Sequence, residues 1–229
     1  MTVTDVNVVK SAIFERPDDA NKGTLGSLLC VCGSYGMAGA AVMSAKGALR
    51  TGIGLAKCAL PRSIYPIVAQ TILESVYYPL SENADGRISK VNVPFLVSES
   101  CKSSATLVGC GLGVCDDTLK IVFSFIENST TPLVLDADAL NCVAKQPEIL
   151  LRKKAPIIIT PHPGEMSRLT GLATPLVNAE RERVALDFAQ KYGVVTVLKG
   201  AGTVIASPNG KVLVNPTGNS GMATGGSGD

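Results

Sequence analysis

Leu28-Leu-Cys-Val-Cys-Gly-Ser-Tyr-Gly-Met-Ala-Gly-Ala-Ala41 joins a short apolar run to a glycine-rich turn and an alanine-rich segment. The apolar run lacks polar alternation, which is typical of a strand buried on both faces of a parallel sheet. The small residues after it predict a turn that opens a helix over residues 37–50. This strand–turn–helix order is the repeating unit of a layered α/β fold.

The same pattern recurs along the chain. Other apolar runs end in glycine or polar loop residues, and helical spacing of apolar positions lies between several of them. Alternation of strands and helices predicts an α/β fold built on a mostly parallel sheet. The predicted strands are 28–33, 54–60, 105–109, 132–136, 156–160 and 194–200, and the further predicted helices are 117–128 and 178–191.

The pattern changes near the end of the chain. Two apolar runs, 203–206 and 211–215, flank Ser207-Pro-Asn-Gly210. Asn-Gly between apolar runs is a strong indication of a β-hairpin. We therefore expect an antiparallel hairpin at one edge of the parallel sheet, and a single domain over residues 1–229.

Composition favours a compact, globular protein. Hydrophobic residues make up 46% of the chain and charged residues 17%, which indicates a globular core. The net charge of +2 gives no electrostatic reason to expect a nucleic-acid or membrane partner. Residues 1–16 are charged and lack an apolar centre, so no signal peptide is expected. No apolar segment reaches the length of a membrane span.

The seven cysteines are scattered through apolar runs. Cys30 and Cys32 are two residues apart, which is neither a redox C-x-x-C pair nor a zinc pair. The single histidine could not complete a zinc site with them. We expect the cysteines to be buried small hydrophobic residues in a reducing cytosol.

Unusual residue clusters follow the predicted strands, and ligands bind at the carboxyl ends of strands in open α/β sheets. Gly33–Ala41 and Gly109-Cys-Gly-Leu-Gly113 would let a ligand approach the backbone closely, although tight packing alone also explains them. The first cluster lacks the G-x-G-x-x-G spacing of a dinucleotide site. Asp136 and Asp138 could hold Mg²⁺ or order a loop, and for Asp138 capping of the next helix is an equal alternative.

Two later strand ends carry single chemical groups. In Thr160-Pro-His-Pro-Gly-Glu165, two prolines fix the backbone around His162, and the alternative is a structural turn with Glu165 as a helix N-terminal acid. Lys199 lies beside glycines, which suits contact with a nucleotide phosphate or ribose, although the stretch is no Walker A loop. The alternative for Lys199 is an exposed lysine before a turn.

The final stretch, Asn215–Asp229, is rich in glycine and ends on its only carboxylate. Consecutive amides in such a loop can form an anion-binding concavity. A carboxylate beside a phosphate site would repel it, so Asp229 is predicted to be a general base for a nucleophile that attacks phosphorus. A flexible tail is the alternative.

These motifs occur in the order found in ADP/ATP-dependent NAD(P)H-hydrate dehydratases of the ribokinase-like superfamily, which the chain resembles from about Lys22 onward. Asn21 and Cys110 depart from the family pattern, which commonly has His and Pro there. The resemblance implies a three-layer α/β/α sandwich, here lacking its C-terminal helices. The motifs that carry it are Gly33-Ser34, Gly39-Ala40-Ala41, Val134–Asn141, Pro161–Glu165, Leu198-Lys-Gly200 with Thr203, and Asn215–Asp229.

The family repairs damaged cofactors, so the resemblance implies an ADP-dependent or ATP-dependent carbon–oxygen lyase for metabolite repair. It would phosphorylate the C6 hydroxyl of (6S)-NADHX or NADPHX and eliminate phosphate, with Mg²⁺ on the nucleotide. A vitamin-precursor kinase of the same superfamily and a catalytically dead nucleotide-binding module are the alternatives.

The resemblance also implies residue roles. Asp229 would be the catalytic base, and the metal ligands stay unassigned. A homotetramer in the cytoplasm is expected. The implied anion hole is Gly226 and Gly228, the nucleotide contacts are Lys199, Gly200, Ala201, Gly202, Thr203 and Gly228, and the hydrate pocket is Ala41, Gly113, His162 and Asp229.

Overall fold

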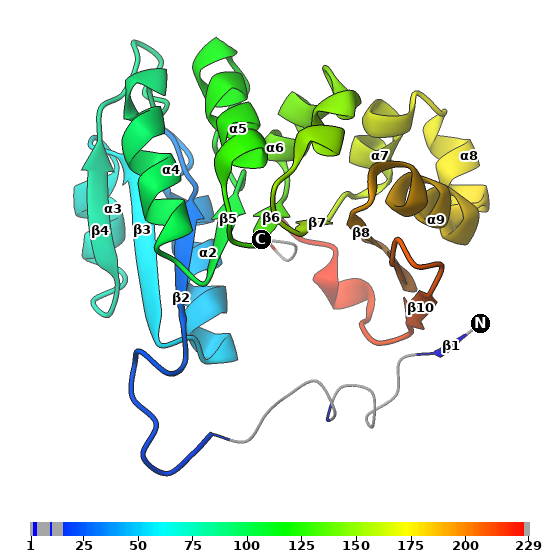
Figure 1. Cartoon of the computed structure of the whole chain (residues 1–229), viewed down its shortest axis with the longest axis horizontal. Coiled ribbons are helices and arrows are strands. Elements are labelled where there is room, and N and C mark those ends of the chain that lie inside the picture. The colour runs from blue at the N-terminus through cyan, green and yellow to red at the C-terminus, as the bar shows by residue number, and fades with distance from the viewer. Residues whose placement is uncertain (1, 4–9, 11–15, 227–229) are drawn as a thin grey trace.

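The computed structural model describes residues 2–3, 10 and 16–226, and within them ten strands form one sheet (Figure 1). Their order is β1-β10-β9-β8-β7-β6-β5-β2-β3-β4. β2 to β8 are mutually parallel, whereas β9 is antiparallel to both β8 and β10. The strands are β1 Thr2–Val3, β2 Ser27–Val31, β3 Leu55–Pro61, β4 Val76–Leu80, β5 Ala105–Val108, β6 Leu133–Leu135, β7 Ile157–Ile159, β8 Val195–Leu198, β9 Thr203–Ala206 and β10 Val212–Asn215.

The predicted mostly parallel sheet and its hairpin are confirmed. Each of the six predicted strands overlaps an observed one, and β9 pairs with β10 in register from Thr203↔Asn215 to Ala206↔Val212. β1 and β4 were not predicted. β4 is an edge strand with Pro79 near its end, a residue that ordinarily argues against a strand because it cannot donate to the ladder.

Helices cover the sheet, and most of the long ones were predicted. The predicted helix 178–191 is instead two helices, because Glu180 leaves helical geometry with φ −125° and ψ 39°. The remaining unpredicted helices are short, so they contain too few turns for a periodic pattern. The helices are α2 Ala38–Thr51, α3 Tyr65–Ala69, α4 Val93–Cys101, α5 Asp116–Asn128, α6 Asp138–Val143, α7 Pro163–Thr170, α8 Thr174–Ala179 and α9 Arg181–Tyr192, with 3₁₀ turns at Lys90–Asn92, Pro147–Arg152 and Ser220–Met222.

Successive side chains of a strand enter different cores, because they point to opposite faces of the sheet. Leu29 and Val31 of β2 join the larger core, which includes residues of α4, α5, α6 and α9. Cys30 of the same strand joins a smaller core with α2 and α3. Helices therefore lie on both faces, as the three-layer prediction requires.

The second face is covered only in part by the described residues. Its core gathers side chains of α2, α3, β2 and β3, with few contributions from elsewhere. On β7, Ile157 and Ile159 are buried in the larger core, whereas Ile158 between them is 36% exposed. Within the described residues, no helix is both long enough and apolar enough to cross a membrane.

All seven cysteines are free thiols. Five of them are buried, as predicted: Cys30, Cys32, Cys58, Cys110 and Cys142. The prediction is wrong for Cys101, which is exposed at the end of α4, and for the half-buried Cys115, which precedes α5. Both stand at helix ends, where apolar sequence does not guarantee burial.

Alkylation by iodoacetamide should therefore separate the cysteines. Burial raises the pKa of the Cys30 and Cys58 thiols, whereas a hydrogen bond with Thr130 lowers the pKa of Cys101. Because the thiolate is the reactive form, Cys101 should be modified first in the folded protein. Cys30 and Cys58 should react only after denaturation, as peptide mass spectrometry would record. Fast labelling of Cys30 in native protein would contradict this arrangement.

Candidate active site

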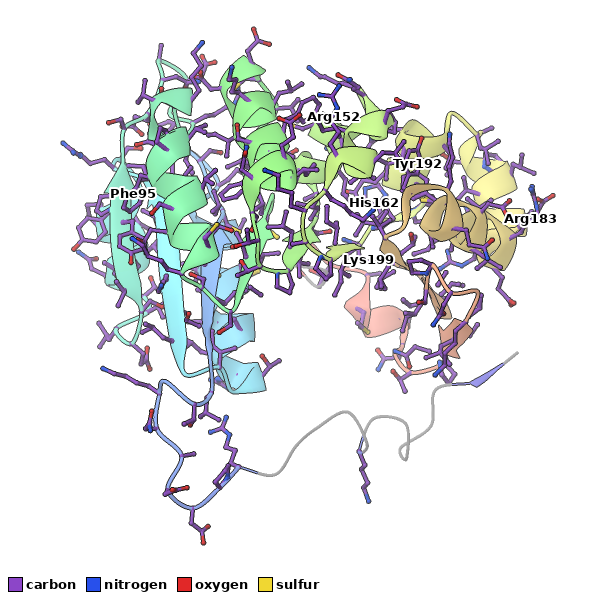
Figure 2. All side chains as sticks on the ribbon, viewed as in Figure 1. Phe95, Arg152, His162, Arg183, Tyr192 and Lys199 are labelled. Atoms are coloured by element: carbon purple, nitrogen blue, oxygen red, sulfur yellow. The ribbon has the colours of Figure 1, made fainter. Side chains whose placement is uncertain are left out.

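The sheet order brings the predicted motifs to one edge. β8, β7, β6, β5 and β2 are consecutive parallel neighbours, so their carboxyl ends lie side by side. Each of these strands is followed by one of the clusters singled out from the sequence. Figure 2 shows His162 and Lys199 near each other in the middle of the molecule, far from Phe95 and Arg183 at its two sides. The edge is therefore the place where a ligand would meet several motifs at once.

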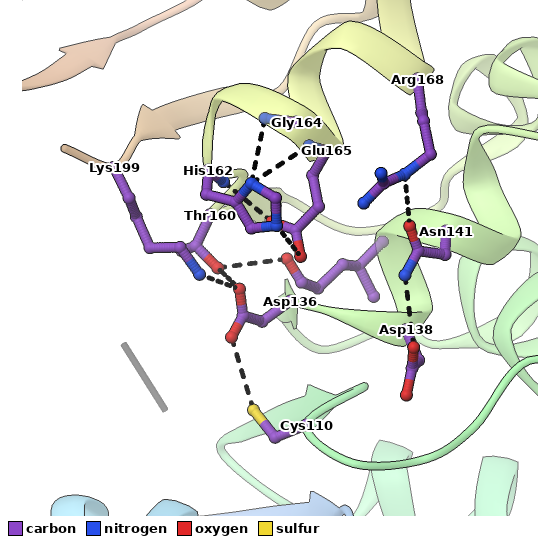
Figure 3. A network of polar contacts seen from close by, with 11 residues as sticks. Cys110, Asp136, Asp138, Asn141, Thr160, His162, Gly164, Glu165, Arg168 and Lys199 are labelled. Carbon is purple, nitrogen blue, oxygen red and sulfur yellow. Dashed lines mark hydrogen bonds and ion pairs between the residues drawn. The ribbon is translucent and has the colours of Figure 1, made fainter. Parts of the chain in front are cut away.

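Asp136 is the centre of this edge (Figure 3). Its side chain is 4% exposed, and its Oδ1 accepts hydrogen bonds from Lys199 Nζ at 2.7 Å and Thr160 Oγ1 at 2.7 Å. Its Oδ2 accepts a bond from Cys110 Sγ at 3.5 Å. One carboxylate after β6 thus ties together residues that follow β5, β7 and β8. Asp136 was expected either to hold Mg²⁺ or to order a loop, and these contacts are those of a residue that orders loops.

Lys199 is not the exposed lysine of the alternative interpretation. Its side chain is 26% exposed and its ammonium is paired with Asp136. Its backbone amide donates to Pro161 O at 2.8 Å, which joins the loop after β8 to the turn after β7. Because the ammonium is already paired, the loop presents mainly backbone groups to a ligand.

A second carboxylate holds the next loop. Asp138 Oδ2 accepts a bond from the Gly113 amide at 2.8 Å, and its Oδ1 accepts one from Asn141 Nδ2 at 3.2 Å. Asp138 also lies in the first turn of α6, where a negative charge is favourable. Ala137 between the two acids has φ 48° and ψ −114°, a strained conformation for a residue with a Cβ. The hydrogen bonds of Asp136 and Asp138 on either side hold Ala137 in this conformation.

His162 has a structural role as well as an exposed position. It is the N-cap of α7, and its Nδ1 accepts bonds from the amides of Gly164 at 3.0 Å and Glu165 at 3.4 Å. Glu165 completes a capping box by accepting from the His162 amide at 2.8 Å. A neutral imidazole must then carry its proton on Nε2, which lies 3.3 Å from Glu165 Oε1. The ring is half exposed, so it can both cap the helix and contact a ligand.

The loop Lys199–Thr203 offers unpaired amides. Thr203 Oγ1 donates to Gly200 O at 3.0 Å, which closes the loop. Within the described part of the chain, the amides of Gly200, Ala201 and Gly202 donate to no acceptor. Beside them lies a cavity of about 590 Å³, lined by Ala201, Gly202 and the start of α9. Clustered free amides of this kind favour an anionic ligand.

The remaining predicted residues fall in different places. Ala41 is buried in α2, so its side chain forms a wall of the core and not a polar contact. Gly226 is the last described residue, and a Cβ on it would overlap the Met43 sulfur of α2. The glycine-rich loop therefore approaches the helix that carries Ala41. Gly228 and Asp229 lie outside the described residues.

Two residues at this edge were missed from the sequence. Thr160 directly follows β7 as Asp136 follows β6, and that position at a strand end could have singled it out. Arg181 donates from Nη2 to Leu198 O at 2.8 Å. In the sequence it is one charge among several in a helical pattern, and nothing there distinguishes it from Arg183.

Comparison with known proteins identifies the class first. A ribokinase-like superfamily protein from Enterococcus faecalis superposes with a TM-score of 0.83 at 22% identity, covering 99% of this chain and 75% of that one. An ADP/ATP-dependent NAD(P)H-hydrate dehydratase from Bacillus subtilis, co-crystallised with ATP and Mg²⁺, superposes with a TM-score of 0.82 at 30% identity, covering 98% and 76%. The fold is therefore ribokinase-like.

Sequence comparison then gives the family. The family model described as NAD(P)H-hydrate dehydratase matches residues 28–229. A bifunctional NAD(P)H-hydrate repair enzyme from Thermofilum pendens is 41% identical over 214 residues, which cover 93% of this chain and 41% of the relative. The chain thus spans about two fifths of the length of the bifunctional relatives that it matches. It belongs to the NAD(P)H-hydrate dehydratase family.

Replacing Asp136 by Asn should destabilise the protein by about 3 kcal/mol, because it leaves the Lys199 ammonium without its counter-charge. The value is at the low end for a buried pair since Lys199 keeps some solvent contact. Asp187→Asn is the matched control: Asp187 pairs with Arg183 on the exposed face of α9, where a pair contributes at most about 1 kcal/mol. Urea denaturation measures both, and equal losses would refute the central place given to Asp136.

Two replacements of His162 should show how much its N-cap hydrogen bonds stabilise the protein. Asn is a good N-cap, so His162→Asn should keep the stability of α7, whereas His162→Ala should cost about 1 kcal/mol. Chemical denaturation of the two variants against the parent protein provides the comparison. Equal stability of the Ala and Asn variants would show that the cap contributes nothing.

Proposed function

We propose that this protein catalyses the nucleotide-dependent dehydration of (6S)-NADHX and NADPHX to NADH and NADPH. The observation that supports the proposal most is the Asp136 network, which holds the loop Lys199–Thr203, called the nucleotide loop below, against the His162 turn. Two groups that the reaction must bring together, a phosphate donor and a nicotinamide hydrate, would then bind at neighbouring strand ends.

The chemistry requires activation of a poor leaving group. The C6 hydroxyl gives its proton to a base while its oxygen attacks the terminal phosphorus of the nucleotide, so ADP becomes AMP or ATP becomes ADP. The lone pair of the ring nitrogen then expels phosphate, and loss of a proton from C5 restores the ring double bond. Reduced cofactor and phosphate are the products.

Residue roles follow from this chemistry. We assign Asp229 as the general base and the amides of Gly226 and Gly228 as donors to the transferring phosphoryl group. The nucleotide loop, Lys199 to Thr203, would contact the nucleotide through its backbone. Ala41, Gly113 and His162 would line the hydrate pocket together with Asp229. In support, the Gly113 amide donates to Asp138, and the turn that carries His162 begins at Thr160, whose hydroxyl donates to Asp136.

Mg²⁺ fits as a companion of the nucleotide phosphates. Within the described residues, no group of three histidine, cysteine, aspartate or glutamate side chains could hold a metal ion. The carboxylates of Asp136 and Asp138 already accept hydrogen bonds from the protein. Mg²⁺ commonly keeps several waters and binds through substrate phosphates, a mode that needs no dedicated protein cage.

The finer assignments extend the proposal. Residues 1–229 would form one ribokinase-like domain. The protein would act as a homotetramer in the cytoplasm. Light scattering on the purified protein would test the tetramer.

Incubation of (6S)-NADHX with the protein and ADP or ATP should restore the absorbance of reduced nicotinamide. Asp229→Asn should lower turnover by about 10²- to 10⁴-fold, the usual contribution of general base catalysis, and leave ADP affinity unchanged. Absorbance assays and calorimetry measure the two quantities. A stable phosphorylated vitamin precursor as the product would instead favour a small-molecule kinase. ADP binding without turnover of any hydrate would favour a catalytically dead module.

A further inference from the structure

Arg181, the first residue of α9, holds both ends of the nucleotide loop. Its Nη2 donates to Leu198 O at 2.8 Å, just before the loop, and lies 3.5 Å from Gly202 O within it. We propose that Arg181 is a positioning residue for nucleotide binding, which fixes these two peptide groups so that the amides between them face the phosphate oxygens of a nucleoside diphosphate or triphosphate. The inference rests on the proposed nucleotide site.

The contacts define two peptide planes. Leu198 O points to Arg181, so the amide on the other side of that peptide, Lys199 N, points away and donates to Pro161 O. Gly202 O points to the same guanidinium and orients the peptide at the far end of the loop. With both ends fixed, the three free amides of Gly200, Ala201 and Gly202 are confined to a short arc. Preorganised amides bind an anion without a further ordering cost.

The electrostatics of Arg181 also favour an anionic ligand. Among the described residues, no carboxylate lies within ion-pair distance of its guanidinium, whereas Arg183 pairs with Glu180 and Asp187. The Nε of Arg181 is buried and has no hydrogen-bond partner in the described structure. Burial lowers the pKa of Arg181, which reflects the cost of placing this cation there. A nearby phosphate would supply the missing negative charge.

Gly200 keeps the approach between loop and arginine open. Its φ is +148°, and a Cβ placed on it would lie 2.9 Å from Arg181 Nη1. A larger residue would therefore strain the backbone and displace the guanidinium. The cavity of about 590 Å³ lies against Arg181, Ala201 and Gly202, so the space beside the amides can receive the rest of a nucleotide.

The test compares Arg181→Ala and Arg181→Lys with Arg152→Ala. Arg152 is an exposed arginine that pairs with Glu127 and does not line the cavity, so its replacement removes a guanidinium away from the proposed nucleotide site. Calorimetry with ADP and Mg²⁺ gives the Kd, steady-state assays give KM for ADP and for (6S)-NADHX, and urea denaturation gives stability.

Arg181→Ala should raise the Kd and KM for ADP at least about tenfold, the loss of one charge-assisted hydrogen bond, with little change in KM for the hydrate. Arg181→Lys should recover part of the affinity, because an ammonium can reach one carbonyl but cannot bridge two. Arg152→Ala should bind ADP as the parent protein does.

Three results would count against the inference. An unchanged ADP affinity in Arg181→Ala overturns it and leaves the proposed function standing. Equal rises in KM for ADP and the hydrate, together with equal losses of stability, reduce Arg181 to a structural residue and overturn it as well. Failure of the parent protein to bind either ADP or ATP overturns the proposed function, and the inference with it. Should Arg181→Ala not fold, Arg181→Lys carries the same comparison.

Discussion

The candidate site depends on the ion pair and hydrogen bonds that the buried Asp136 carboxylate makes. A buried carboxylate is costly unless it is paired and hydrogen-bonded, so its neighbours must supply a cation and donors. Here the cation is Lys199 and the donors are Thr160 and Cys110, each from a loop after a different strand. The need to satisfy one charge therefore sets the relative positions of three loops. The sheet brings those loops to one edge, and Asp136 fixes how they meet.

In this arrangement, both backbone amides and a side chain are available to bind an anion. Lys199 is the cation of the loop itself, yet its charge is already balanced by Asp136. The groups left for a phosphate are the free amides of residues 200–202, with the guanidinium of Arg181 beside them. A site made of preorganised amides and a cation without a carboxylate suits a nucleotide that must bind, transfer a phosphoryl group and leave.

Much of the fold could be predicted from local pattern, because buried parallel strands are continuous apolar runs and the Asn-Gly hairpin has its own turn chemistry. β4 was not predicted because it contains Pro79. The helix break at Glu180 was not predicted because the helical periodicity continues across it. The meeting of the motifs at strand ends could be predicted, because the carboxyl ends of neighbouring parallel strands lie at the same edge of the sheet. The pairing of Lys199 with Asp136 and the hydrogen bond from Arg181 to Leu198 O could not be predicted. Both join residues far apart in sequence, and no local pattern encodes the directions of these side chains.

The proposed reaction comes from the family resemblance, whereas the structure shows how Lys199, Thr160 and Cys110 are held around Asp136. A crystal structure of the protein with ADP, Mg²⁺ and the product NADPH would test the central claim most directly. The account predicts phosphate oxygens on the amides of Gly200 to Gly202, with the nicotinamide ring beside His162 and Gly113. A nucleotide bound away from that loop, with the Asp136 network intact, would contradict it.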